Sequence, residues 1–195
     1  MSLKGSKTCS DYIEWNVVQS LILKLERDRE HKFALLIAIG AYTGLRISDL
    51  LSLKWNDLLE RDILNIVEKK TQKSRKITLN KQLREIINRI YKSQHSIDPD
   101  SLIFLNRWGN RAFTIQYVNQ KLKRIAAKYK IAKDVSTIKS HSLRKSFGRR
   151  VFQNNDNSEL ALILLSDILN HTSAKTTKAY LGIRDKEIAD VYANL

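Results

Sequence analysis

Residues that crosslink or interrupt a chain are scarce in this sequence. Cys9 is the only cysteine among 195 residues, which excludes an intrachain disulfide and a cysteine-based zinc cluster. One proline and six glycines leave few helix breakers, so the composition favours helices. The longest apolar run, residues 33–39, is too short to span a membrane, and no signal peptide is evident at the N-terminus. These absences indicate a protein of the reducing cytoplasm.

Acidic residues are few relative to basic ones. The 35 Lys and Arg residues exceed the 20 Asp and Glu residues, which gives a net charge of +15 and a pI near 9.9. Such an excess predicts a polyanionic partner, because Lys and Arg side chains near phosphates release condensed counterions. With 43% hydrophobic and 28% charged residues, the chain is expected to be a folded globular protein. A ribosomal-type protein and a membrane-surface protein are the alternatives at this point.

Hydrophobic periodicity predicts a mainly α domain with one small antiparallel β-sheet. The length of 195 residues suits one domain with a sizeable core. We expect helices at residues 16–26, 30–42, 47–53, 81–93, 114–129, 142–153, 158–169, 174–181 and 185–193. Residues 63–67 and 76–79 contain β-branched residues and predict a hairpin across the polar stretch 68–75. Residues 57–60 are a candidate third strand.

Two arginines occur in contexts that suit phosphate binding. Arg46 follows the helix-ending Gly44 and begins a new helical turn, where a guanidinium can project into a cleft. Arg144 lies three positions after His141 (144 − 141 = 3), so the two share a face if this segment is helical. Two guanidinium groups can hold the non-bridging oxygens of one phosphodiester and stabilise a pentacoordinate phosphorus. Either arginine considered alone is better explained as a solvated surface charge.

One tyrosine and two histidines complete this candidate site. Tyr180 lies nine positions after His171 (180 − 171 = 9) and is one of seven tyrosines. A phenol with an ordinary pKa of about 10 needs a base and a positive surrounding to attack at neutral pH. His141 is a candidate to accept the phenol proton, and His171 is a candidate to donate a hydrogen bond to the phosphate. Tyr180 alone would be assigned to the core; together with these residues it is the predicted nucleophile.

Other titratable residues have less specific contexts. Lys70 lies in the predicted hairpin turn, from which a lysine can reach the minor groove beside the scissile phosphate and protonate the leaving 5′-oxygen. Lys69 and Lys73 are alternatives for this role. Asp49, one helical turn after Arg46, is expected to orient that guanidinium, or else to be a simple acid at a helix N-terminus.

Histidines outside these segments carry no such expectation. His31 and His95 are interpreted as polar surface or helix-end residues. No cluster of carboxylates or histidines with ligand spacing surrounds His141 and His171, so the sequence predicts no metal site.

Taken together, these segments resemble the catalytic domain of the tyrosine recombinases, the lambda-integrase family that includes Cre and the Xer proteins. Residues 43–50 (Thr-Gly-Leu-Arg-Ile-Ser-Asp-Leu) resemble the family's first arginine box, and residues 70–71 (Lys-Thr) resemble its hairpin lysine. Residues 141–144 (His-Ser-Leu-Arg) match its His-x-x-Arg element. Residues 169–173 (Leu-Asn-His-Thr-Ser) resemble Leu-Gly-His-Ser-Ser, and residues 175–180 match the segment bearing the nucleophile. The resemblance extends from about residue 11 onward, with Asn170 in place of the usual glycine.

The resemblance implies an enzyme that needs neither a metal nor a nucleotide cofactor. Tyr180 would attack a DNA phosphodiester and form a 3′-phosphotyrosyl link, and the 5′-hydroxyl of a partner duplex would reverse the reaction to seal a recombinant strand. The implied roles are phosphate binding by Arg46, Arg144 and His171, general base catalysis by His141 and general acid catalysis by Lys70. The implied partners are double-stranded DNA and further copies of the chain, as a tetramer on two duplexes.

The resemblance also bears on domain organisation. Family members normally carry an N-terminal core-binding domain, for which there is no room before residue 16, so we expect a catalytic fragment or a rare minimal member. Residues 1–10 are expected to be a flexible segment or an expression remnant, and residues 11–195 the catalytic domain. Residues 185–195 place Ile188, Val191 and Leu195 at helical spacing, and resemble the tail that docks on a neighbouring protomer. A self-packed final helix is the alternative.

Three rival functions are compatible with parts of the pattern. A type IB topoisomerase uses the same residue types to relax supercoils, but the Thr-Gly-Leu-Arg and Leu-x-His-x-Ser forms favour the recombinases. A non-catalytic DNA-binding regulator would be favoured by loss of Arg46, Arg144 or Tyr180, and all three are present. A basic helical RNA-binding protein would explain the charge but not the ordered motifs.

Overall fold

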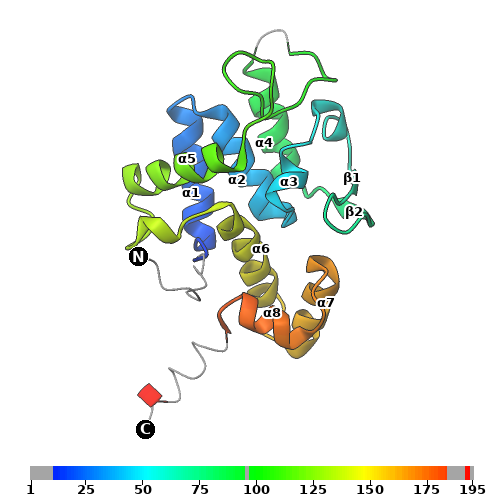
Figure 1. Cartoon of the computed structure of the whole chain (residues 1–195), viewed down its shortest axis with the longest axis vertical. Coiled ribbons are helices and arrows are strands. Elements are labelled where there is room, and N and C mark those ends of the chain that lie inside the picture. The colour runs from blue at the N-terminus through cyan, green and yellow to red at the C-terminus, as the bar shows by residue number, and fades with distance from the viewer. Residues whose placement is uncertain (1–10, 95–96, 184–191, 194–195) are drawn as a thin grey trace.

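Helices dominate the computed structural model of this protein, which describes residues 11–94, 97–183 and 192–193 (Figure 1). The first half contains helices α1 (Trp15–Arg27), α2 (His31–Thr43) and α3 (Ile47–Leu50), a 3₁₀ turn at Trp55–Asp57, strands β1 (Ile63–Val67) and β2 (Ser74–Thr78), and helix α4 (Lys81–Lys92). The second half contains α5 (Ile115–Lys128), a 3₁₀ turn at Val135–Thr137, α6 (Ser140–Asn154), α7 (Glu159–Leu169) and α8 (Ala174–Tyr180). The predicted fold class, mainly α with a small antiparallel sheet, is confirmed.

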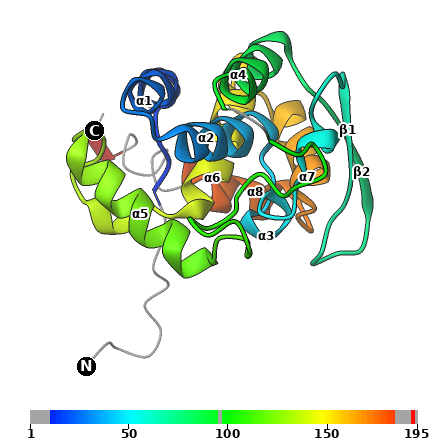
Figure 2. The ribbon, with the colours of Figure 1, turned by 90° about the horizontal axis from the view of Figure 1, so that it is seen from above.

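Helix α2 forms the centre of the main core. Its side chains are apolar on nearly every face, and residues 33–41 are all buried, as expected for a helix covered on several sides. It packs against α1, α4 and α6, which surround it in Figure 2. Gly40 permits the close approach of α6, because a Cβ atom at this position would lie 2.8 Å from Leu143 Cδ1. The site residues on α6 are therefore held against the end of α2.

The small sheet is a single two-stranded hairpin at the edge of the molecule (Figure 2). Its antiparallel register pairs Ile63 with Thr78 and Val67 with Ser74. The inward-facing Leu64 and Ile77 are buried, whereas the turn between the strands is largely exposed. The strands thus anchor on the core, while the basic side chains of the turn are exposed.

A second, smaller apolar cluster lies among α6, α7 and α8. It contains Phe152, Leu165, Leu169 and Leu181, while Leu143 near the start of α6 belongs to the main core. Helix α6 therefore joins the two clusters. The segments with His171 and Tyr180 are attached to the rest of the molecule through this helix (Figure 1).

Two expectations for the elements need correction or comment. The candidate strand at residues 57–60 is wrong: Trp55 is buried, the Leu58 amide bonds the Trp55 carbonyl at 2.9 Å, and Glu60 is left-handed with φ 54°. Local turn formation around a buried indole thus replaces strand pairing. The helix expected at 185–193 lies almost entirely outside the described residues. No described helix is long and apolar enough to cross a membrane.

Candidate active site

Arg46 is positioned by the way in which α2 ends. Gly44 is the C-cap in the left-handed conformation, with φ 63°, and a Cβ atom there would lie only 2.5 Å from Phe147 Cδ1. The Thr43 hydroxyl donates to the Ile39 carbonyl at 2.6 Å, which fixes the last turn. Arg46 then serves as the extended N-cap of α3. In the Thr-Gly-Leu-Arg segment, α2 therefore ends and α3 begins within four residues.

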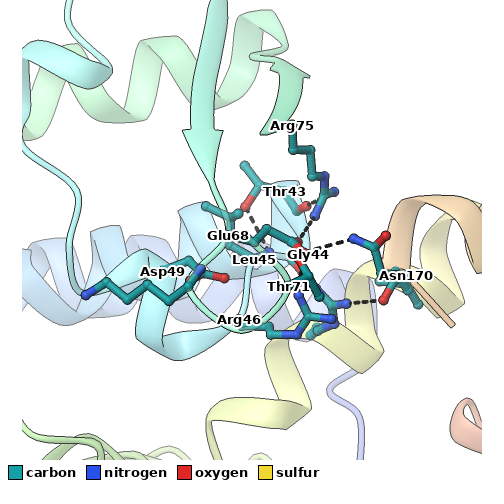
Figure 3. Close-up of polar contacts among 12 residues, drawn as sticks. Thr43, Gly44, Leu45, Arg46, Asp49, Glu68, Thr71, Arg75 and Asn170 are labelled. Atoms are coloured by element: carbon teal, nitrogen blue, oxygen red, sulfur yellow. Dashed lines mark hydrogen bonds and ion pairs between the residues drawn. The ribbon is translucent and has the colours of Figure 1, made fainter. Parts of the chain in front are cut away.

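The carboxylate that holds Arg46 is Glu68, at the end of β1 (Figure 3). Its Oε2 accepts hydrogen bonds from Arg46 Nη1 at 2.6 Å, Thr71 Oγ1 at 2.8 Å and Asn170 Nδ2 at 2.9 Å. Arg75 Nη1 lies 3.5 Å from Oε1, and Arg75 Nη2 donates to the Thr43 carbonyl at 3.0 Å. Burial alone would raise the pKa of Glu68, but the bonds from Thr71 and Arg46 lower it. Glu68 is thus ionised and fully buried, and its carboxylate joins the four side chains just named.

Asp49 is also buried but has a different partner. Its Oδ1 accepts a hydrogen bond from the Lys69 backbone amide at 2.9 Å, and the role expected for Asp49 in contacting Arg46 falls to Glu68 instead. Asp49 therefore secures the start of the hairpin turn. Lys69, Lys70 and Lys73 are all exposed on that turn.

Arg144 lies at the junction of two helix ends. Its Nη1 donates to the Gly44 carbonyl and its Nη2 to the Leu169 carbonyl at 2.7 Å, so one guanidinium caps both α2 and α7. Burial lowers the pKa of Arg144 to about 10, and Tyr180 opposes this change. The group therefore stays charged at neutral pH. Arg144 is only 4% exposed, so its charge lies in a largely dehydrated site.

His171 is oriented by a chain of hydroxyl groups. Its Nδ1 lies 3.0 Å from Thr177 Oγ1, which lies 2.8 Å from Ser166 Oγ, and Ser166 in turn donates to the Leu162 carbonyl at 3.0 Å. The Thr177 hydroxyl also lies 3.3 Å from the Ser173 carbonyl, so its one proton can go to that carbonyl, to Ser166 or to His171 Nδ1. Neutral His171 can donate from Nε2 to a phosphate oxygen in the tautomer in which Nδ1 accepts from the Thr177 hydroxyl. Burial lowers the pKa of His171, and Arg144 and Arg46 lower it further.

Tyr180 packs edge-on against His171, with ring centroids 4.9 Å apart. Its hydroxyl oxygen is buried and has no hydrogen-bond partner of normal geometry within the described residues. Burial raises the pKa of Tyr180 above its ordinary value, while Arg144 and Arg46 oppose the rise. The Lys145 ammonium lies 5.5 Å from the Tyr180 ring centroid. A buried, protonated phenol thus lies within the electrostatic influence of two guanidinium groups.

His141 is in the first turn of α6, and Arg144 follows one turn later on the same helix. Loss of hydration lowers the pKa of His141 although its side chain keeps solvent contact, and nearby cations lower it further: Arg144, Lys145, Lys139 and Lys70. His141 is therefore neutral near pH 7 and able to accept a proton. The influence of Lys70 on the pKa of His141 indicates that the hairpin turn lies near the start of α6.

The structure brings together most of the residues singled out from the sequence. Arg144 and Arg46 both act on the pKa values of His171 and Tyr180, whose rings are in contact, and Arg144 and Lys70 both act on the pKa of His141. The sequence analysis missed Glu68, Arg75, Asn170 and Thr177 as site residues. Glu68 could have been selected as the one acidic residue directly before a lysine-rich turn. No feature of the neighbouring sequence distinguishes Thr177 from other threonines. Within the described residues, no group of His, Cys, Asp and Glu could hold a metal ion.

This arrangement matches a known family. The model of the phage integrase family matches residues 12–187, nearly the whole chain. The chain belongs to this family. The domain is a tyrosine recombinase catalytic domain.

Named relatives agree with this assignment. The chain is 30% identical over 176 residues to the probable integrase/recombinase YoeC of Bacillus subtilis, covering 90% of this chain and 88% of that protein. It is 28% identical over 155 residues to the tyrosine recombinase XerD of Lacticaseibacillus casei, covering 77% of this chain and 50% of that protein. Against the Xer-type relatives, the chain thus spans about half of the length.

Solved structures agree on the fold. The XerA recombinase superposes with a TM-score of 0.71 at 22% identity, covering 100% of this chain and 66% of that one. The catalytic domain of the bacteriophage HP1 integrase superposes with a TM-score of 0.59 at 16% identity, covering 88% of this chain and 86% of that one. A post-cleavage complex of the XerH recombinase with its difH substrate superposes with a TM-score of 0.69 at 22% identity, covering 100% and 55%.

Proposed function

We propose that this chain is the catalytic part of a site-specific DNA recombinase that cleaves and rejoins DNA through Tyr180. The observation that carries the proposal is the buried Tyr180 hydroxyl, which makes no hydrogen bond of normal geometry within the described residues and whose pKa, raised by burial, is lowered in part by the nearby Arg144 and Arg46. A phosphodiester placed between these groups would satisfy all three. Two XerH structures that superpose on this chain are complexes with difH substrates, which supports DNA as the partner.

The proposed reaction begins with attack of Tyr180 Oη on a phosphorus atom. The Oη–P bond forms, the bond from phosphorus to the 5′-oxygen breaks, and the phosphate stays joined to the 3′ end. The phenol proton passes to neutral His141, and Lys70 protonates the leaving 5′-oxygen. Arg46, Arg144 and His171 bind the non-bridging oxygens, whose charge grows in the transition state. A 5′-hydroxyl from a partner duplex reverses these steps and seals a new strand.

The pKa directions suit this division of roles. A phenol whose pKa is raised cannot ionise in advance at neutral pH, so its proton must leave as the new bond forms. His141 has a lowered pKa and is therefore available as a base. His171 also has a lowered pKa, with its ring held by Thr177.

We further propose that the protein works as an oligomer on DNA in the cytoplasm, where its substrate lies. Helix α7 exposes Leu160, Ile163 and Leu164 by 64%, 52% and 47%. An apolar face of this kind suits the tail segment 185–195 of a neighbouring copy, with Ile188, Val191 and Leu195 as its apolar residues. Cross-linking on DNA should give tetramers that are lost in Ile163→Asp.

Covalent trapping tests the proposed chemistry. The chain would be incubated at low salt with duplexes nicked beside a candidate cleavage position, so that the short 5′-hydroxyl product diffuses away and the adduct accumulates. A protein–DNA adduct that resists denaturant is expected for the unaltered chain and not for Tyr180→Phe. Adducts of equal yield in Tyr180→Phe would refute Tyr180 as the nucleophile, and bound but uncleaved DNA throughout would favour a regulator.

A further inference from the structure

The last turn of α7 is joined to the β-hairpin by one side chain. Asn170 is the C-cap of α7, with φ 49° in the left-handed region that asparagine tolerates better than most residues. Its Nδ2 donates to Glu68 Oε2 at 2.9 Å, across 102 positions of the sequence. Figure 3 shows Asn170 reaching toward Glu68 beside Arg46 and Thr71. Asn170 directly precedes His171 in the sequence, so this bond connects Glu68 to the residue next to a candidate phosphate ligand.

Backbone geometry alone does not account for an asparagine here. Glycine would adopt φ 49° with less strain, and a glycine would leave Glu68 without its donor from α7. Glu68 is fully buried and ionised, so each donor that it loses has a substantial cost. The same Oε2 also accepts from Arg46 Nη1 at 2.6 Å. One oxygen therefore connects the residue before His171 with the guanidinium of Arg46.

We propose that Asn170 is a positioning residue, whose bond to Glu68 sets His171 against Arg46 so that both reach the same phosphate. The inference rests on the proposed function, because it assigns the shared ligand as a phosphodiester. His171 also has supports of its own: its amide donates to the Ser166 carbonyl at 2.9 Å and its ring contacts Thr177. Loss of the Asn170 bond should thus shift the His171 loop relative to Arg46 without unfolding α7 or α8.

Asn170→Gly separates the side-chain bond from the backbone conformation. Histidine NMR titration of the full 195-residue chain supplies a readout without DNA. The charged groups that act on the His171 ring are Arg144 from α6 and Arg46 from the α2–α3 junction, and Tyr180 of α8 packs against it. If the loop moves away from the two arginines, the pKa of His171 should rise toward its ordinary value. His141, on α6, is the internal control and should titrate as before.

Thr71→Val is the matched control variant. Thr71 donates to the same Oε2 of Glu68 at 2.8 Å but lies in the hairpin turn, so its loss should leave the His171 titration in place. An unchanged His171 titration in Asn170→Gly would overturn the proposal, as would an equal shift in both variants. Either result would reduce Asn170 to a helix cap.

Cleavage of nicked duplexes supplies the second readout. Asn170→Gly should bind DNA within twofold of the unaltered chain, yet form the Tyr180 adduct roughly tenfold more slowly at saturating DNA. A shifted His171 titration with an unchanged adduct rate would also overturn the proposal. Failure of the unaltered chain to form any adduct would instead count against the proposed function, while the titration would still decide whether Asn170 sets the position of His171.

Discussion

At the scale of single residues, the site depends on buried polar groups whose partners are far away in the sequence. Glu68 pairs with Arg46 across 22 positions, and Arg144 bonds the Gly44 carbonyl across 100. The histidines could be selected from the sequence because they lie inside short motifs. The supporting residues could not, since a threonine or glutamate acquires its role only once the fold brings a partner to it.

Thr177 offers the sharpest test at this scale. Thr177→Val keeps the shape of the buried side chain but removes the hydroxyl that orients His171. Loss of one buried hydrogen bond of about 1.5 kcal/mol should slow adduct formation roughly tenfold. Thr177→Ser retains the hydroxyl and should stay within about threefold of the unaltered rate. Equal rates for the Val and Ser variants would show that the hydroxyl does not act on His171.

Acid titration tests the two site histidines. The folded-state pKa values of His141 and His171 lie below the ordinary value of about 6.5, so near pH 6 the unfolded chain binds more protons. The free energy of unfolding should therefore fall as the pH drops through about 6.5, and these groups stop contributing below their folded-state pKa values. Urea unfolding between pH 7.5 and 5 measures this slope. A His141→Gln, His171→Gln variant with the original slope would contradict the assignment.

At the scale of elements, most helices could be predicted from apolar periodicity and capping residues. Asn80, Thr114 and Ser158 each cap a helix with their side chains, close to the predicted starts. The short α3 ends at Leu50 rather than at residue 53, and the predicted strand at 57–60 is a turn. After α3 the chain bonds a distant segment instead, with the Ile103 amide donating to the Leu53 carbonyl at 3.0 Å and Lys54 bridging to Leu102, and local propensity does not encode such contacts.

Gly44 links the end of α2 to the placement of Arg46. Gly44→Ala should lower the free energy of unfolding by about 3 kcal/mol, from left-handed strain and from the clash with Phe147. Gly109→Ala is the matched control, because Gly109 also has positive φ but its added Cβ would meet nothing within 4 Å. That variant should lose only about 1 kcal/mol. Equal losses in urea unfolding would show that contact with Phe147 is not tight.

At the scale of the whole molecule, the net charge of +15 determines which partners the protein attracts, and it does not determine the fold. The charge is spread along the chain, and the exposed lysines of the hairpin turn place part of it beside the site. Composition alone therefore indicated a polyanion, and only the ordered motifs distinguished a DNA strand transferase from other basic proteins.

Binding of duplex DNA should depend steeply on salt. If six or more phosphates are neutralised, affinity should fall by roughly 10³ between 50 and 200 mM salt. Fluorescence anisotropy with a labelled duplex measures the slope, and Lys70→Ala combined with Lys73→Ala should make it shallower. A salt-independent affinity, or a preference for RNA over duplex DNA, would contradict the proposal that the protein binds the phosphate backbone of DNA.

The central claim is that Tyr180 forms a covalent bond to the 3′ end of a cleaved DNA strand. Trapped adduct would be digested with nuclease and protease and analysed by tandem mass spectrometry, with the DNA labelled at one end or the other. The account predicts a nucleotide mass on the phenolic oxygen of Tyr180 and a free 5′-hydroxyl on the released strand. A modification on another residue, or a 5′-phosphate linkage, would contradict it.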